Sequence, residues 1–249
     1  MKPNIVLLHG WGSHPHVWRA FARTLRANAH MPALPGYAGT PVCEPYTLER
    51  IVETLATAAP KQCIVVGWSL GAQVALTWAR RFPRQVQRLV LIAATPSFAQ
   101  RSDWPHAAKP ELLRQFTQQL KRDAPALLRR FVALQSQGET QQVRVAHKLR
   151  TALFTNAPPL GQALAGGLEI LRTADLRASL ASIVQPTLVI HGAQDAVTPC
   201  DAGRALAQLL PHTTLHVMQG TGHAPFLSDG DGVAALINAF STDEKDGRE

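Results

Sequence analysis

Long hydrophobic runs and cysteine are both scarce in this sequence. No apolar stretch among the 249 residues reaches the roughly 18 residues of a transmembrane helix, so we expect no membrane span. The first apolar run, residues 5–8, is too short for a signal-peptide core and precedes His-Gly-Trp-Gly, not a cleavage site. The 3 cysteines form no CxxC pair, which disfavours a disulfide framework and a thiolate metal site. These features predict a cytoplasmic protein with reduced thiols.

Acidic residues are also few. Asp and Glu number 17 against 25 Lys and Arg, a formal net charge of +8. Such an excess permits nucleic acid, an anionic membrane or an acidic protein as partner. We expect no nucleic-acid binding, because no aromatic-interleaved platform or reading helix accompanies the charge. With 46% hydrophobic and 17% charged residues, the composition is that of a globular chain able to bury a sizeable core.

Short apolar runs alternate with helical patterns in both end portions of the chain. Strands are predicted at residues 5–8, 62–67, 88–93, 186–192 and 214–218. Helices are predicted between them at 17–29, 48–59, 70–81, 202–210 and 232–240. Near-continuous β-branched strands separated by helices are typical of a mostly parallel sheet with helices on both faces.

The middle of the chain has a different pattern. Between residues 97 and 172 the sequence predicts no strand and four helices, at 110–120, 124–134, 141–153 and 160–171. We therefore expect an α/β core of residues 1–96 and 173–240, a helical cap of residues 97–172 and a flexible tail of residues 241–249. Ligands of open α/β sheets bind beyond the C-terminal strand ends, so the cap would cover that site.

Residues 67–71 read Gly-Trp-Ser-Leu-Gly between a predicted strand and a predicted helix. A GxSxG turn in this position exposes the serine oxygen at the top of the sheet, and its glycines admit the strained backbone. Ser69 is therefore the predicted nucleophile. A helix-capping serine is the alternative interpretation.

A serine nucleophile needs a base, and the base needs an orienting acid. His223 follows the last predicted strand, and Asp195 follows the strand before it. The order Ser69, Asp195, His223 is the order expected for this topology. His9 and His191 also lie at strand ends, but His9 belongs to a different motif and His191 comes just before the loop of Asp195. A surface-loop histidine is the alternative interpretation of His223. Asp175 and Asp201 are alternatives to Asp195 that do not close a strand in this way, and a turn Asp remains possible.

Residues 9–12, His-Gly-Trp-Gly, follow the first strand directly. A tetrahedral intermediate of acyl transfer needs preorganised N–H donors at its oxyanion. The backbone N–H groups of Trp11 and Leu70 are the expected pair. A tight glycine turn with Trp11 in the core is the alternative.

These motifs resemble the α/β-hydrolase superfamily over nearly the whole chain, and within it the pimeloyl-[acyl-carrier protein] methyl ester carboxylesterases of biotin synthesis (the BioH type). The segments that carry the resemblance are HGWG (9–12), LPGY (34–37), GWSLG (67–71), DWP (103–105), FVALQ (131–135), GGLEIL (166–171) and GHAPF (222–226). The resemblance implies an α/β-hydrolase fold with an inserted cap. It also implies a serine carboxylesterase that removes the methyl group from a carrier-bound pimeloyl ester and needs no metal or organic cofactor.

The same resemblance implies a set of substrate contacts and two departures from the family. The implied substrate contacts are Trp11, Ser69, Leu70, Phe131, Val132, Ala133, Leu134, Gln135 and His223. The family usually opens with an extra β-hairpin, and this chain starts almost at the HGWG strand, so we expect two edge strands fewer. Ala33 stands where an Asp is usual.

Basic residues gather in the predicted cap. Residues 97–172 hold 11 Lys and Arg against 5 Asp and Glu, a net charge of +6. Such a basic face would steer and dock an acidic acyl-carrier protein, and a merely solvated face is the alternative. The predicted docking residues are Arg129, Arg130, Arg144, Lys148 and Arg150.

Other functions remain open on the sequence. A broad-specificity short-chain carboxylesterase, a thioesterase or a carbon–carbon bond hydrolase would use the same three residues. A haloalkane dehalogenase or epoxide hydrolase is disfavoured, because those enzymes place Asp where Ser69 stands. A non-catalytic binding protein on the same scaffold is the alternative from another class. We expect a monomer.

Overall fold

A six-stranded sheet forms the centre of the molecule in the computed structural model, which describes residues 2–242. The strands are β1 (Asn4–Leu8), β2 (Asn28–His30), β3 (Cys63–Trp68), β4 (Val86–Ile92), β5 (Thr187–Gly192) and β6 (Thr213–Met218). Their order is β2-β1-β3-β4-β5-β6, and every pairing between them is parallel. The prediction of a mostly parallel sheet is confirmed, and the described strands are all parallel.

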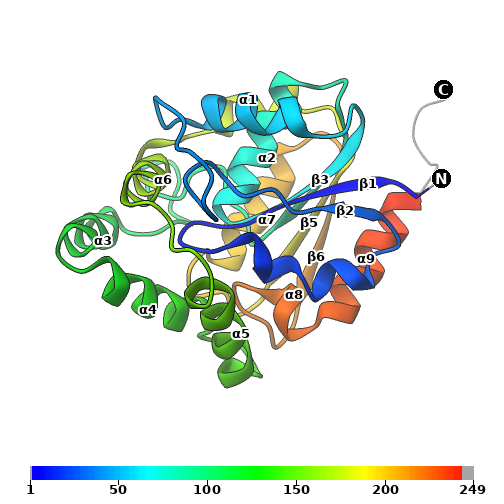
Figure 1. Cartoon of the computed structure of the whole chain (residues 1–249). Helices are drawn as coiled ribbons and strands as arrows, with labels where there is room; N and C mark the ends of the chain where they lie inside the picture. The colour runs from blue at the N-terminus through cyan, green and yellow to red at the C-terminus, as the bar shows by residue number, and fades with distance from the viewer. Residues whose placement is uncertain (1, 243–249) are drawn as a thin grey trace.

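Helices cover both faces of this sheet (Figure 1). One face carries α1 (Leu48–Ala58), α2 (Leu70–Arg81), the 3₁₀ helix η3 (Arg177–Ser182) and α7 (Cys200–Leu209). The other carries the 3₁₀ helices η1 (Pro15–Trp18) and η2 (Phe21–Thr24), together with α8 (Pro225–Ser228) and α9 (Gly230–Thr242). Strands β1, β3, β4 and β5 are almost wholly buried, because each needs apolar cover on two sides.

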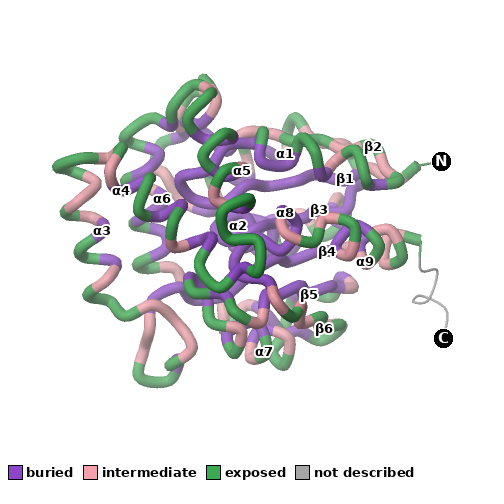
Figure 2. Tube along the Cα trace, turned by 90° about the horizontal axis from the view of Figure 1, so that it is seen from below, coloured by how far each residue is buried: buried purple, intermediate pink, exposed green. Residues whose placement is uncertain are grey.

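Four further helices lie between β4 and β5 in the sequence. These cap helices are α3 (Pro110–Arg122), α4 (Ala124–Gln135), α5 (Gln142–Phe154) and α6 (Gly161–Thr173). They gather beyond the C-terminal ends of the strands, and their outer surfaces are exposed while their inner sides are buried (Figures 1 and 2). The chain runs from β1 to one edge of the sheet and from β3 toward the other, so the crevice where α/β folds bind ligands lies between these two strands.

The helix predicted over residues 17–29 is wrong. The structure has two short 3₁₀ helices there, followed by the edge strand β2. Trp18 and Phe21 are both buried and pack on Phe226, with Trp18 stacked at 4.1 Å between ring centroids. A spacing of three residues fits a 3₁₀ helix as well as an α-helix. Strand β2 pairs with β1, with Asn28 opposite Asn4. This pairing requires an extended backbone at residues 28 and 29, where the helix was expected to end.

Two other differences concern the end of the chain. The four-residue helix α8 follows His223 and was not predicted, because one turn has no detectable periodicity. Helix α9 continues through Thr242, two residues into the predicted tail. The rest of that tail, residues 243–249, lies outside the described residues. Among residues 2–242, none of the helices has the length and apolarity needed to cross a membrane.

Candidate active site

Ser69 lies in the turn between β3 and α2 with a strained backbone. Its φ of 57° and ψ of −119° are outside the ordinary regions for a residue with a side chain. The flanking glycines make this turn possible. A Cβ on Gly67 would lie 2.3 Å from the carbonyl oxygen of Gly71, and a Cβ on Gly71 would lie 2.5 Å from that of Leu8. Only glycine at both positions lets α2 start this close to the sheet.

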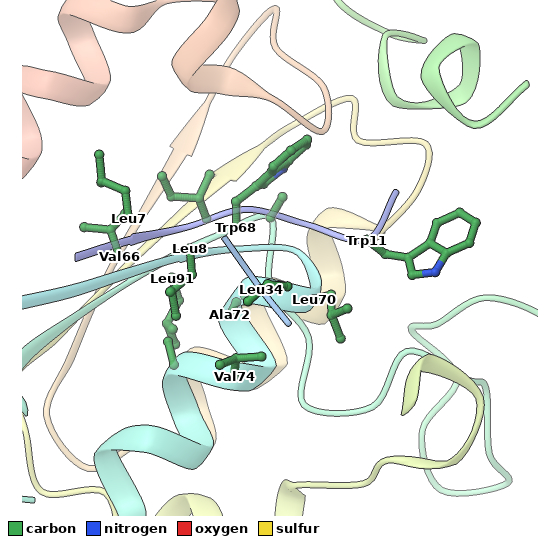
Figure 3. Packing of buried hydrophobic residues seen from close by; sticks show 14 of the residues in the cluster. Leu7, Leu8, Trp11, Leu34, Val66, Trp68, Leu70, Ala72, Val74 and Leu91 are labelled. Carbon is green, nitrogen blue, oxygen red and sulfur yellow. The ribbon is translucent and has the colours of Figure 1, made fainter. Parts of the chain in front are cut away.

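The His-Gly-Trp-Gly turn after β1 lies directly beside Ser69. A Cβ on Gly10 would lie 3.2 Å from the Cβ of Ser69. Gly12 has a φ of 57°, and its N–H donates to the Tyr37 hydroxyl at 3.3 Å. Figure 3 shows Trp11 projecting from the end of β1, away from the leucines of the core. There its indole N–H donates to the carbonyl of Leu164 on α6 at 2.8 Å.

The two N–H groups predicted for an oxyanion remain available. Neither the backbone N–H of Trp11 nor that of Leu70 has a hydrogen-bond acceptor within residues 2–242. Leu70 is the first residue of α2, where N–H groups have no partner inside the helix. A helix N-terminus also carries partial positive charge, which favours an anion.

Asp195 and His223 form a buried hydrogen-bonded pair. His223 Nδ1 lies 2.8 Å from Asp195 Oδ2 and 3.0 Å from Oδ1, and both side chains are fully shielded from solvent. Asp195 follows β5 and His223 follows β6, so adjacent strand ends bring together residues 28 positions apart. An ionised carboxylate at Nδ1 makes that nitrogen the donor and leaves Nε2 free to accept a proton.

The acid loop keeps Asp195 ionised. Burial alone would raise its pKa, but His223 and His191 beside it hold the pKa of this carboxyl well below its usual range. Oδ1 also accepts the backbone N–H groups of Val197 at 2.8 Å and Thr198 at 2.9 Å. A charged carboxylate that accepts this many donors is stabilised despite its burial.

The loop of His223 is hydrogen-bonded to the turn that contains Ser69. The indole N–H of Trp68, the residue before Ser69, donates to the backbone carbonyl of His223 at 2.7 Å, and the two rings lie 5.6 Å apart. His223 Nε2 is buried and has no hydrogen-bond partner among the described residues. Ser69 is 8% exposed. Hydrogen bonds of catalytic groups are often open until substrate binds.

The alternatives to these residues have other partners. His9 Nε2 accepts the N–H of Leu34, and burial lowers the pKa of His9 to about 4, so it is a neutral structural histidine. His191 lies against the carbonyl of Thr198 at 2.9 Å and supports the acid loop. Asp175 forms an ion pair with Arg177, and Asp201 forms one with Arg204.

The five residues 131–135 lie on one helix and therefore face different directions. Phe131 on α4 is buried and packs edge-to-face on Trp11 at 5.1 Å. Gln135 is also buried, whereas Leu134 is half-buried. Val132 and Ala133 line a groove on the outer side between α4 and α5, and Ala133 is exposed there. Because successive helical residues turn by about 100°, one ligand cannot meet all five directly.

Sequence reasoning missed three residues beside the His-Gly-Trp-Gly turn. A Cβ on Gly12 would lie 2.7 Å from the Leu128 side chain on α4. A Cβ on Gly167 of α6 would likewise lie 2.7 Å from the Trp11 ring. Leu164 supplies the carbonyl that accepts from Trp11. For Leu128 and Leu164 the available signal was their helical spacing from Phe131 and Leu168, but such spacing indicates burial and not which strand end is contacted. Gly167 had no such signal.

The predicted docking residues do not share one face. Arg129 and Arg150 line the outer groove between α4 and α5. Arg130 lies over the ring of Phe116 at 5.5 Å, and Arg144 donates to Gln141. Lys148 lies on the other side of α5, where its ammonium donates to the carbonyl of Leu227 at 2.6 Å.

A second groove adds basic residues that the sequence analysis missed. This basic groove, of about 580 Å³, lies between α5, the two 3₁₀ helices and α8. Arg19, Arg23 and Lys148 line it, and no acidic residue does. Phe21 and Phe226 also line it. Arg19 and Arg23 were not distinguished in the sequence because they belong to the segment interpreted there as a helix of the core.

Among residues 2–242 there is no group of three or more His, Cys, Asp or Glu placed to hold a metal ion.

The alpha/beta hydrolase fold family matches residues 3–230. The chain belongs to this family. It is 41% identical to the pimeloyl-[acyl-carrier protein] methyl ester esterase of Nitrosomonas europaea over 96% of this chain and 95% of that protein. It is 42% identical to the protein of the same name from Aromatoleum aromaticum, over 95% of this chain and 97% of that protein. This chain and these relatives form one family over nearly their full lengths.

Solved structures agree on the fold. An esterase from Exiguobacterium antarcticum superposes with a TM-score of 0.84 at 20% identity, covering 97% of this chain and 93% of that one. MenH from S. aureus superposes with a TM-score of 0.80 at 21% identity, covering 98% of this chain and 95% of that one.

Proposed function

We propose that this chain is a serine carboxylesterase that hydrolyses the methyl ester of pimeloyl-[acyl-carrier protein] to pimeloyl-[acyl-carrier protein] and methanol in biotin biosynthesis. The observation that carries the proposal is a strained Ser69 whose neighbour Trp68 is hydrogen-bonded to the loop of a buried Asp195–His223 pair. The full-length relatives of this chain bear that enzyme's name. The chain is a carboxylic ester hydrolase, as these relatives are.

The reaction is acyl transfer through a covalent intermediate. His223 Nε2 takes the proton of Ser69 as the hydroxyl oxygen attacks the ester carbonyl. Asp195 holds the imidazole in the right tautomer and stabilises its charged form. The N–H groups of Trp11 and Leu70 donate to the oxyanion. Methanol leaves with the proton from His223, and water then hydrolyses the acyl-serine through the same histidine.

Apolar side chains of the cap helices supply the acyl channel. Residues 97–172 act as the cap, and Phe131 and Leu128 reach the turn of residues 9–12 from α4. Leu128 and Leu164 also line a small cavity of about 200 Å³ between α4, α5 and α6. Apolar walls of this kind suit a methylene chain, which gains from leaving water.

An acidic carrier protein docks on the basic surface around α5. On one side lies the basic groove with Arg19, Arg23 and Lys148. On the other lies the groove with Arg129 and Arg150. Positive potential on both sides raises the encounter rate with a negatively charged partner. Every residue given a role here comes from one chain, which is consistent with a monomer. We further propose that the protein acts in the cytoplasm and that its own side chains and backbone N–H groups carry the reaction without a metal or organic cofactor.

Intact-mass spectrometry of a methyl-pimeloyl carrier protein, incubated with this enzyme or with Ser69→Ala, tests the function. We expect the carrier to lose the mass of one CH₂ while the thioester stays, because only the methyl ester is cut. Ser69→Ala leaves the carrier unchanged and keeps the wild-type circular dichroism spectrum.

Other outcomes contradict the proposal in distinct ways. Loss of the whole acyl group would make the protein a thioesterase. An unchanged carrier with a small ester still cleaved would indicate a broad-specificity carboxylesterase. Turnover by Ser69→Ala would refute the assignment of the nucleophile.

A further inference from the structure

The linker between α4 and α5, residues 137–140, contacts both loops of the Asp195–His223 pair. A Cβ on Gly138 would lie 2.3 Å from the carbonyl oxygen of Gln194, the neighbour of Asp195. Thr140 donates twice to the carbonyl of Gly220, from its N–H at 3.0 Å and from its hydroxyl at 2.8 Å. One short segment of the cap therefore touches the acid loop and the histidine loop together.

Glu139 is the central residue of this linker, and it points inward. It is only 5% exposed. Its Cγ and Oε1 both lie 3.3 Å from the place of a Cβ on Gly222, the residue before His223. The N–H groups of Gly222 and Ala224 and the hydroxyl of Ser228 lie near enough to favour its charged form. Neither carboxyl oxygen, however, makes a hydrogen bond of ordinary geometry within residues 2–242.

Burying a carboxyl group without a cation is costly. Glu139 has no ion pair among the described residues. The negative charge of Asp195 repels a charged Glu139 and so also raises its pKa. The backbone that Glu139 contacts, at Gly222, is adjacent to His223. Lys148 on α5 donates instead to Leu227, the neighbour of Ser228. An apolar residue would fill this space at lower cost, so the presence of a carboxyl here calls for a role other than stability.

We propose that Glu139 is a positioning residue for the catalytic histidine: from the linker of the cap helices it holds the backbone of residues 222–224 and thereby the imidazole of His223. The inference rests on the proposed function, because it needs His223 to be the base. It also links the cap helices that receive the acyl chain to the base that cleaves the ester, through Glu139, Thr140 and Gly138.

Because Glu139 is buried, its contribution to the stability of the protein should depend on pH. Burial raises the pKa of Glu139 above its ordinary value, against the three donors that lower it. A group whose pKa is raised on folding adds stability below its unfolded pKa, and that contribution is lost as the pH rises through the folded pKa. Glu139→Gln removes this dependence. The melting temperature of Glu139→Gln should therefore rise relative to the wild type between about pH 4.5 and pH 8.

The activity test uses a small soluble ester, p-nitrophenyl acetate, and the rate at which a fluorophosphonate labels Ser69. Both report the activated serine without the carrier protein. For Glu139→Gln at about pH 8 we expect roughly tenfold lower kcat and labelling rate, with KM changed less than about twofold. Glu139→Asp keeps a carboxyl group and should recover part of the loss. Glu169→Gln is the matched control, because it removes an exposed acid of α6 whose ion pair, within residues 2–242, is with Arg172.

The outcomes separate this inference from the proposed function. Wild-type rates in Glu139→Gln would overturn the positioning role. The positioning role would also be overturned if the melting temperature of Glu139→Gln fell equally at about pH 4.5 and pH 8 and activity fell only in proportion to the folded protein. Glu139 would then be a structural residue. Failure of the wild type to demethylate the carrier, with the small ester cleaved, would refute only the proposed substrate. A wild type that reacts with neither probe would refute the function and this inference together.

Discussion

At the scale of single residues, the site depends on charges that the protein interior holds in place. Asp195 is fully buried, yet two backbone N–H groups and two histidines surround its carboxylate. Its pKa is therefore low even though burial opposes ionisation. Ser69 and His223 needed only their motifs to be predicted, because a strained GxSxG turn and a histidine after the last strand are local features. The environment of Asp195 and the burial of Glu139 are not local, and no pattern in the sequence indicated them.

Asp195→Asn tests the charge of this residue. A carboxyl group whose pKa is lowered on folding adds stability above its unfolded pKa of about 3.9, and that stability is lost as the pH falls through the folded pKa. We expect the variant to be less stable by about 2 kcal/mol near pH 7. The difference should shrink toward about pH 3, as measured by urea unfolding. Esterase activity should fall by about 10⁴-fold, because the imidazole loses its orienting anion. A stability difference that is the same at every pH would contradict the low pKa.

At the scale of elements, close backbone packing positions Ser69, the nucleophile that we propose. Helix α2 begins at Leu70 because glycines on both sides of Ser69 let it approach β1 and β3. Five of the six described strands and the four helices between β4 and β5 were predicted to within a few residues, since their apolar patterns are strong. The structure of residues 17–29 was predicted wrongly for two reasons. Their few apolar residues fit the spacing of a 3₁₀ helix as well as that of an α-helix. The pairing of β2 with β1 joins residues about 24 positions apart, which a short window of sequence does not contain.

Gly71→Ala tests this packing. The new Cβ would lie 2.5 Å from the carbonyl oxygen of Leu8 and 2.7 Å from that of His9, so α2 must shift away from β1. We expect a loss of about 3 kcal/mol in the free energy of unfolding and a disturbed Ser69 turn with strongly reduced esterase activity. Gly161→Ala, at the start of α6, is the control, because nothing lies within 4 Å of its Cβ position. Equal stability of the two variants, measured by urea unfolding, would contradict the packing argument.

At the scale of the whole molecule, surface charge influences which partners approach the protein. The sequence indicated that the region of residues 97–172 is basic, with a net charge of +6. Only the fold shows that these charges lie around several sides of α4 and α5 and that Arg19 and Arg23 of the core join them in the basic groove. The docking surface that we propose is therefore assembled from segments far apart in the chain.

Charge reversal tests this surface. We expect Arg19→Glu with Arg23→Glu, and separately Arg130→Glu with Arg144→Glu, to raise KM for the methyl-pimeloyl carrier protein roughly tenfold at low salt. Turnover of p-nitrophenyl acetate should stay within about twofold, because the small ester needs no docking. Arg84→Glu is the control, since this residue follows α2 at the opposite end of the sheet from the cap helices. Equal losses on both substrates would refute docking at these residues.

The amino-acid sequence by itself determined five of the six described strands and the four helices between β4 and β5, and it indicated Ser69, Asp195 and His223 as the candidate catalytic residues. Each of these depends on local patterns, such as periodicity, glycine turns and strand ends, that a short window of sequence contains. Only the tertiary structure decided which cap residues reach the site, how the basic residues divide between two grooves, and where Glu139 is buried. Those properties depend on contacts between residues distant in sequence, because burial and electrostatics are set by what packs against a side chain and not by its neighbours along the chain.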